Sequence, residues 1–159
     1  MQARPPAIRL AASTVALPAE EIAGPLRPVA LNGARTLDAP AGTVDVGLWS
    51  AGASLDASSG TTLLVGHVSY GSQGNGVFFR LPRVRPGDAV DTADARGKIS
   101  RWVVISRRDY LKSALPPEVF AGLRGPRRLV LVTCGGPTVR LPDGARAFAN
   151  NVVVVAVPA

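Results

Sequence analysis

The sequence predicts a β-rich fold, either a barrel or a sandwich of seven or eight short strands. The chain contains 17 glycines and 14 prolines among its 159 residues, and this density of turn formers leaves little room for long helices. Short apolar runs recur between clusters of Gly, Pro, Asp and Ser, which is the spacing expected of such a fold. Hydrophobic residues make up 47% of the chain and charged residues 18%, and this composition indicates a compact core rather than disorder.

Eight apolar segments are expected to form the strands, namely 7–15, 28–31, 44–49, 61–65, 89–92, 101–107, 128–133 and 152–157. The last two, RLVLVT and VVVVAV, are continuous apolar runs, which indicates central strands buried on both faces. Helices are expected to be short and few. Residues 75–81 (NGVFFRL) are expected to form one or two turns that pack Phe78, Phe79 and Leu81 inward, and a second short helix is expected over residues 117–123, with a proline near its first turn.

The length of the chain predicts one domain, because single cores commonly contain ~100–200 residues. We expect residues 1–159 to form this domain, with residues 1–6 as a flexible Pro-containing arm. The single cysteine excludes an internal disulfide bond. No stretch reaches the ~18 apolar residues that a membrane span needs, and residues 1–24 lack the charged head and apolar centre of a signal peptide.

The net charge of +7 arises from 18 Lys and Arg against 11 Asp and Glu, and nearly all the basic residues are arginine. This excess predicts either a solvated basic surface or an anionic partner, such as the lipids and polymers of a cell envelope. Nucleic acid is a minor alternative, because aromatic residues make up only 5% of the chain and no known nucleic-acid-binding motif occurs.

Two reactive side chains follow predicted central strands. His67, the only histidine, comes after the run TTLLVG, and Cys134, the only cysteine, comes after RLVLVT. The end of a strand fixes a side chain while the following loop leaves it accessible, so these are positions where catalytic groups are commonly presented. A cysteine nucleophile needs a base or a cationic partner, and a histidine supplies one. One Cys and one His cannot complete a zinc shell, so we expect no metal and no cofactor.

The segments TLLVGHVSYGSQGNGVFFRLPRVRPGD at 62–88, RLVLVTCGGP at 128–137 and NNVVVVA at 150–156 together resemble the sortase family of cell-wall transpeptidases. The resemblance covers about residues 7–157, and the Gly-His and Thr-Cys-Gly-Gly patterns are most similar to the actinobacterial class F group. It implies a closed eight-stranded β-barrel. It also implies that Cys134 attacks the Thr-Gly carbonyl of an LPxTG-like sorting signal to form a thioester, which an amine acceptor then resolves, with His67 as general acid and base.

The resemblance also implies an arginine that donates hydrogen bonds to the substrate and to the oxyanion, a role for which the fixed fork of a guanidinium is suited. Counting back five residues from Asn151, which resembles the asparagine that opens the last strand, gives Arg146. Arg140, six residues after the cysteine, is the alternative. The chain departs from the family pattern at 149–151, where Ala-Asn-Asn stands near the position at which other sortases often carry an arginine.

Two further residues are expected to shape the oxyanion site and the substrate groove, Thr133 by its resemblance to a family threonine and Gly135 through its backbone amide. Asp88, Asp91 and Asp94 are expected to be solvated surface rather than a calcium site. The implied partners are sorting-signal peptides of secreted proteins and an amine acceptor such as a peptidoglycan precursor. The implied location is outside the cytoplasm, with a membrane anchor that is not in this chain.

Two alternatives remain open from the residues alone. One is a cysteine peptidase that transfers the acyl group only to water. The other is a non-catalytic β-barrel binding module in which Cys134 is inert, since a lone cysteine after an apolar strand is often a buried structural thiol.

Overall fold

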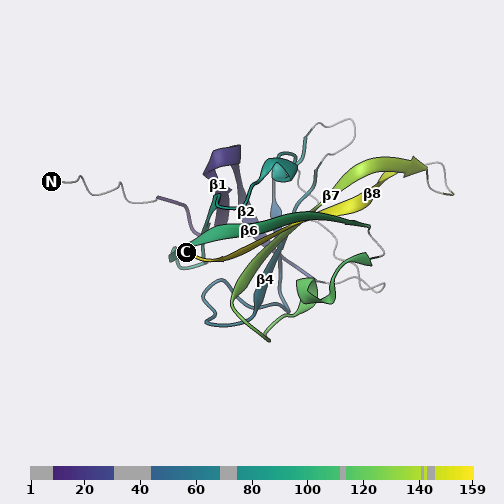
Figure 1. Ribbon diagram of the computed structural model, residues 1–159. Helices are drawn as coiled ribbons and strands as arrows, with labels where there is room; N and C mark the ends of the chain where they lie inside the picture. Colours follow the sequence, from purple (N-terminus) through teal and green to yellow (C-terminus); the bar gives the residue numbers. More distant parts are fainter. Residues whose placement is uncertain (1–8, 31–43, 69–74, 112–113, 141, 143–145) are drawn as a thin grey trace.

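The computed structural model describes residues 9–30, 44–68, 75–111, 114–140, 142 and 146–159; residues 134–139 and 146–149 are described by their backbone alone. Eight strands close into a barrel in the order β1-β2-β3-β4-β7-β8-β6-β5 (Figure 1). The strands are β1 (Thr14–Leu17), β2 (Ile22–Val29), β3 (Val46–Trp49), β4 (Thr61–Val65), β5 (Ala89–Ala93), β6 (Ile99–Leu111), β7 (Arg128–Arg140) and β8 (Arg146–Pro158). The mostly β, closed eight-stranded barrel predicted from the sequence is therefore confirmed.

Among the described residues, three 3-10 helices lie between the strands: η1 (Pro18–Glu20), η3 (Leu81–Arg83) and η5 (Pro117–Phe120). The predicted helix at 75–81 is wrong, because residues 77–80 form turns and η3 begins only at Leu81, where Pro82 suits a first turn. The predicted helix at 117–123 is the shorter η5. Within the described residues no helix is long and apolar enough to cross a membrane.

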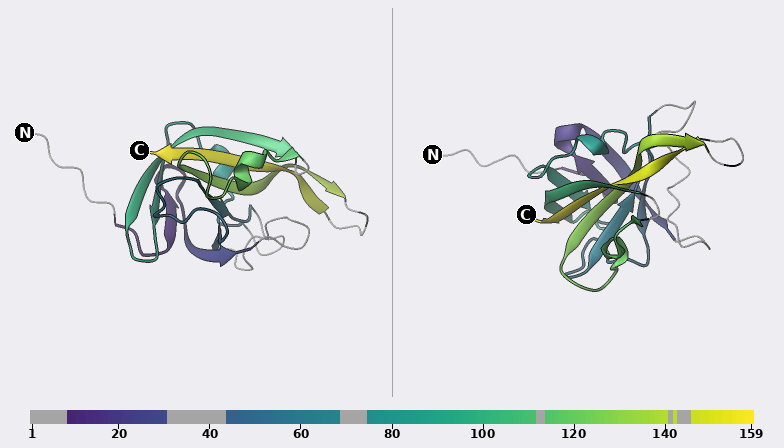
Figure 2. Two further views of the ribbon diagram at one scale, coloured as in Figure 1. Left: turned by 90° about the horizontal axis from the view of Figure 1, so that it is seen from below. Right: turned by 45° about the vertical axis from the view of Figure 1, so that its right-hand side comes forward.

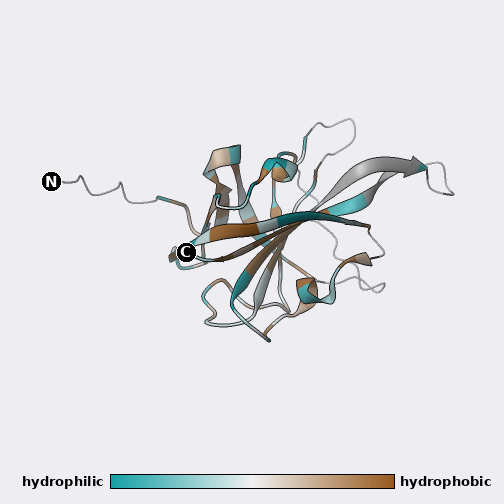
Figure 3. Cartoon of the chain, viewed as in Figure 1, coloured by the Kyte–Doolittle hydropathy of each residue, from teal (hydrophilic) through white to brown (hydrophobic). Residues whose placement is uncertain are grey.

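The main hydrophobic cluster fills the barrel, because all eight strands contribute to it. Its largest fully buried side chain is Phe78, and Leu64, Leu131 and Val154 represent the central strands. Phe79, which was also expected in the core, is instead 40% exposed. In Figure 3 the first half of β6 is hydrophobic and the second half hydrophilic, which matches the burial of Trp102 and Val104 near its start.

A second cluster lies on the other face of the central strands. It contains alternate residues of β4, β7 and β8, such as Leu63, Val130 and Val153, and η5 covers it with Val119. The ring of Phe120 stands edge-on to Trp49 of β3, with ring centroids 5.7 Å apart. Strands β7 and β8 are consequently packed on both faces, as their continuous apolar runs predicted, and β4 is packed in the same way.

Several predicted strand boundaries are wrong. The first strand was expected at 7–15 but covers Thr14–Leu17, and β2 was expected at 28–31 but covers Ile22–Val29. Strand β2 contains Pro25 and Pro28, and prolines indicate a break because they donate no ladder hydrogen bond.

Strands β7 and β8 are both longer than predicted, so Cys134 lies inside β7 and not after its end. The pairing of the two strands shifts register between Gly135 and Thr138 and then continues to the pair Arg140↔Arg146. Figure 2 shows this hairpin extending past the barrel in both views.

Candidate functional site

Parallel pairing of β4 with β7 aligns the two chain segments that lead to His67 and Cys134. The register runs from Thr61↔Arg128 to Val65↔Val132. One residue further, the N–H of Gly66 donates to the carbonyl of Val132 at 3.1 Å. His67, just after the end of β4, and Cys134, within β7, are each two residues beyond the last register pair, so the ladder aligns the segments that lead into them.

Thr133 links these two segments through its side chain. Its Oγ1 donates to the carbonyl of Gly66 at 2.7 Å, and the residue is only 2% exposed. The hydrogen bond therefore joins the residue before the cysteine to the residue before the histidine, 67 positions apart. A buried hydroxyl with its partner in place makes this a fixed connection rather than a solvated contact.

Strand β8 completes the surroundings of the cysteine backbone. Cys134 lies opposite Asn151, and Gly135 lies opposite Asn150 at the point where the register begins to shift. Strand β7 is thus flanked by β4 and β8, and the candidate nucleophile sits on an inner strand of the sheet. Such a position suits a group that must be held in a fixed place.

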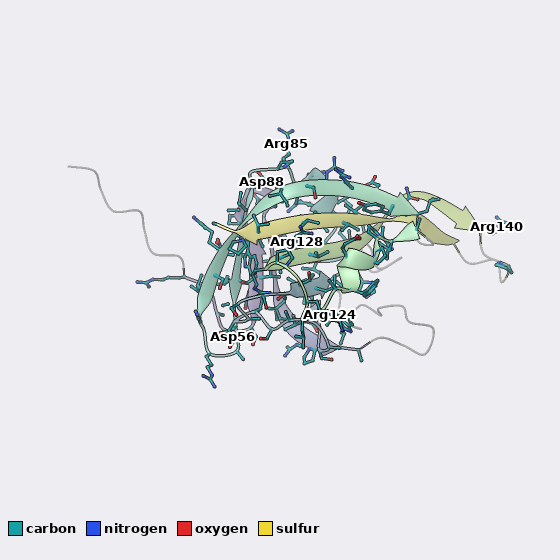
Figure 4. The ribbon with its side chains drawn as sticks, turned by 60° about the horizontal axis from the view of Figure 1, so that its bottom comes forward. Asp56, Arg85, Asp88, Arg124, Arg128 and Arg140 are labelled. Atoms are coloured by element: carbon teal, nitrogen blue, oxygen red, sulfur yellow. The ribbon has the colours of Figure 1, made fainter. Side chains whose placement is uncertain are left out.

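Neither predicted arginine lies beside the cysteine along the strands. Arg146 and Arg140 are paired with each other at the end of the β7–β8 hairpin, and Figure 4 shows Arg140 far from Arg128 at the other end of β7. The five residue steps from Asn151 back to Arg146 correspond to roughly 17 Å of extended strand. The β4–β7 pairing therefore aligns the segments that carry His67, Thr133 and Cys134, and the backbone of neither arginine lies beside them.

The backbone of His67 is held by residues that the sequence reasoning missed. The N–H of Phe78 donates to the carbonyl of His67 at 2.9 Å, and the N–H of Gly76 donates to the carbonyl of Val68 at 3.1 Å. The glycine at 76 was visible in the sequence, but no periodicity or spacing relates it to His67.

The three aspartates expected on the surface have specific partners, and that expectation is wrong for Asp91. Asp91 is 2% exposed and accepts two hydrogen bonds from Arg101, from Nε at 2.8 Å and from Nη2 at 3.1 Å. Asp94 accepts from backbone N–H groups of its own turn, and Asp88 accepts from the N–H of Arg85 at 2.9 Å. In the described part of the chain, no group of three or more His, Cys, Asp or Glu residues is arranged to hold a metal ion.

Comparison with known protein families identifies the class to which this barrel belongs. The model of the sortase domain matches residues 23–159, so the chain belongs to the sortase family of cysteine transpeptidases. A search of curated proteins gives no match.

Solved sortase structures share the fold at low sequence identity. Sortase A from Corynebacterium diphtheriae has a TM-score of 0.68 and 16% identity, over 96% of this chain and 62% of that one. Sortase C-1 from Actinomyces oris gives 0.67 and 17%, over 92% and 73%. Sortase A from Listeria monocytogenes gives 0.64 and 16%, over 92% and 85%. At these identities the likeness shows the fold, and the roles of individual residues need their own tests.

Proposed function

We propose that this sortase cleaves an LPxTG-like sorting signal between Thr and Gly and transfers the new carboxyl end to an amine acceptor. The observation that supports the proposal is the β4–β7 register, which aligns the two segments that lead to the only histidine and the only cysteine of the chain. A cysteine nucleophile and its proton-exchanging partner need this kind of proximity.

In the first half-reaction the Cys134 thiolate attacks the Thr carbonyl carbon, and a tetrahedral oxyanion forms. When it collapses, the C–N bond breaks, the leaving amine takes a proton from the His67 imidazolium, and a thioester remains. In the second half-reaction His67 takes a proton from the incoming amine, which attacks the thioester and releases the thiolate. Imidazole suits both proton transfers because its ordinary pKa is near neutral.

The remaining roles follow the family pattern. Arg146 would donate hydrogen bonds to the substrate backbone and the oxyanion, with Arg140 as the alternative, while Thr133 and the amide of Gly135 would shape the oxyanion site. Either arginine can serve only if the β7–β8 hairpin brings its side chain back over ~17 Å of strand, or if the substrate itself bridges that distance.

The finer identity of the enzyme is also part of the proposal. The Gly-His and Thr-Cys-Gly-Gly patterns favour class F among the sortases. The substrates would be sorting signals of secreted proteins, and the acceptor would be an amine such as that of a peptidoglycan precursor. The enzyme would then work outside the cytoplasm, at the cell membrane.

The test is mass spectrometry of the products after incubation with an LPxTG peptide and an amine acceptor. We expect cleavage after Thr and joining to the amine, with no product from Cys134→Ala or His67→Gln. Hydrolysis without transfer would favour a peptidase, and no reaction together with a Cys134 that resists alkylation would favour a binding barrel. Arg146→Ala should lower turnover at least tenfold with the fold intact, and the same loss in Arg140→Ala instead would move the role to Arg140.

A further inference from the structure

We infer that residues 76–78 act as a support that fixes the position of His67, and that Gly76 and Phe78 are positioning residues for the transfer reaction. The catalytic part of this inference rests on the proposed function. The structural part, that these residues determine where His67 lies, stands on the contacts of the segment itself.

Two backbone hydrogen bonds bring the support against the histidine. Phe78 donates to the carbonyl of His67 at 2.9 Å, and Gly76 donates to the carbonyl of Val68 at 3.1 Å. Strand β4 ends at Val65, and these two hydrogen bonds hold the backbone again at residues 67 and 68. The donors belong to a segment about ten positions later in the sequence. His67 is held from this side at its own carbonyl and at the carbonyl of the next residue.

Gly76 packs directly on the backbone of His67. A Cβ atom added at residue 76 would lie against the carbonyl oxygen of His67, 2.5 Å from its carbonyl carbon and 2.8 Å from its Cβ. Rotating a side chain cannot relieve such a contact, because the atoms that block it belong mainly to the backbone. Gly76 is not among the glycines with positive φ, so the space beside His67 requires a glycine and the local backbone conformation does not.

Phe78 anchors the support in the barrel core. Its side chain is 0% exposed and belongs to the main hydrophobic cluster. A Cβ atom added at Gly66 would lie 2.7 Å from the Phe78 ring, so ring and backbone are in close contact immediately before the histidine. On its other side, the carbonyl of Gly66 accepts the hydrogen bond from Thr133. The backbone leading into His67 is thus clamped between the core and β7.

This clamp matters for catalysis because proton transfer requires the imidazole to stay within hydrogen-bonding reach of its partners. A displacement of about 1 Å can reduce a rate by a factor of ~100 even when all reacting groups are present. Gly76→Ala should therefore displace His67 without removing any reactive group.

The experiment uses His67 as its own probe, since the chain has one histidine and so one imidazole Cε1–H signal in the proton NMR spectrum. The variant is Gly76→Ala, and the matched control is Gly52→Ala. A Cβ atom at residue 52 would also be crowded, 3.1 Å from the Trp49 ring and 3.2 Å from the carbonyl oxygen of Thr61, but at the opposite end of β4. Thermal unfolding, the NMR signal, kcat and KM for the LPxTG peptide are measured for each.

We expect both variants to unfold at a lower temperature than the wild-type protein. Only Gly76→Ala should move the His67 signal and lower kcat at least tenfold, with KM changed less than twofold. A folded Gly76→Ala protein with an unchanged His67 signal would overturn the inference. Should this variant not fold, Phe78→Leu keeps the backbone donor but weakens the anchor, and it should move the His67 signal where Leu129→Val, elsewhere in the same core cluster, does not.

The two proposals fail in different ways. If the wild-type protein transfers no peptide, or if His67→Gln remains fully active, the proposed function is wrong, while the NMR comparison of Gly76→Ala with Gly52→Ala still decides the structural inference. If transfer depends on His67 but Gly76→Ala leaves kcat unchanged, the function stands and the positioning role is wrong.

Discussion

Replacing Glu20 by glutamine should stabilise the protein at pH 8 and leave its stability at pH 5 nearly unchanged. Glu20 is only 8% exposed, and its Oε2 is buried without a hydrogen-bond partner among the described residues. Burial raises the pKa of Glu20 from 4.5 to about 7, and the hydrogen bond and negative charge of Asp88 act in the same direction. Asp88 lies beside Arg85 at one edge of the barrel (Figure 4).

The direction of the pH effect on stability follows from the number of protons that the folded and the unfolded states bind. Between pH 4.5 and about 7 the folded protein keeps a proton on Glu20 that the unfolded chain has lost, so stability falls as pH rises through this range. The interval is about two and a half pH units at 1.36 kcal/mol each, which gives a loss of at most about 3 kcal/mol. The pKa of Asp88 is lowered below 3.8, chiefly by the hydrogen bond from Glu20, and its effect therefore falls at more acid pH.

Urea unfolding followed by tryptophan fluorescence measures this effect at pH 5 and pH 8. Trp49 and Trp102 are both buried and provide the signal. Glutamine keeps an N–H donor for Asp88 but has no charge to lose, so Glu20→Gln should remove most of the pH dependence. Glu21→Gln is the control, because that neighbouring side chain is 84% exposed and its ion pair with Arg80 is long, at 3.8 Å. Equal pH dependence in the wild-type and Glu20→Gln proteins would refute the reasoning.

Two further substitutions test contacts that hold the barrel. Arg127→Met should lower the free energy of unfolding by about 2–4 kcal/mol, because it removes three contacts of the guanidinium. The guanidinium donates to Thr62 Oγ1 and to the carbonyl of Ser54, each at 2.8 Å. It also lies 4.8 Å from the centre of the Trp102 ring. Urea unfolding beside Arg124→Met, an exposed control, measures the difference, and equal losses would contradict it. Thr133→Val should cost about 1–2 kcal/mol by leaving the Gly66 carbonyl without its side-chain donor, whereas Thr133→Ser keeps that donor and should cost less. Equal unfolding midpoints for Thr133→Val and the wild-type protein would show that this hydrogen bond adds nothing.

The central strands could be predicted from the sequence because their burial leaves a local signal. Strands buried on both faces need continuous apolar residues, and 128–133 and 152–157 supply them. Strand β2 has no such signal, because its two prolines interrupt the run and its neighbours β1 and β3 determine its place. The residues alone also did not separate a barrel from a sandwich, since closure depends on pairings between strands far apart in the chain.

Asp91 shows why burial of a single polar residue was not predictable. It lies directly opposite Arg101 in the β5–β6 register, ten positions away in the sequence. The arginine compensates for burial of the carboxylate with two hydrogen bonds, so a charged residue is tolerated at a position that its residue type marks as surface. Only the register reveals the partner.

The proposed site shows the same contrast between residues that a local sequence pattern indicates and residues whose place depends on the pairing of distant strands. His67 and Cys134 could be proposed as the reacting pair because each is a reactive residue that follows an apolar run. The packed strands β4 and β7 align the segments that lead to them through Val65↔Val132 and Thr133. The arginine proposed to hold the oxyanion has no comparable signal. Strand β6 pairs with β8 only as far as Asn150, and the part of β8 before this residue pairs with β7 alone among the described strands. Apolar periodicity therefore cannot indicate which arginine acts with the cysteine, and turnover measured in Arg146→Ala and Arg140→Ala decides the assignment.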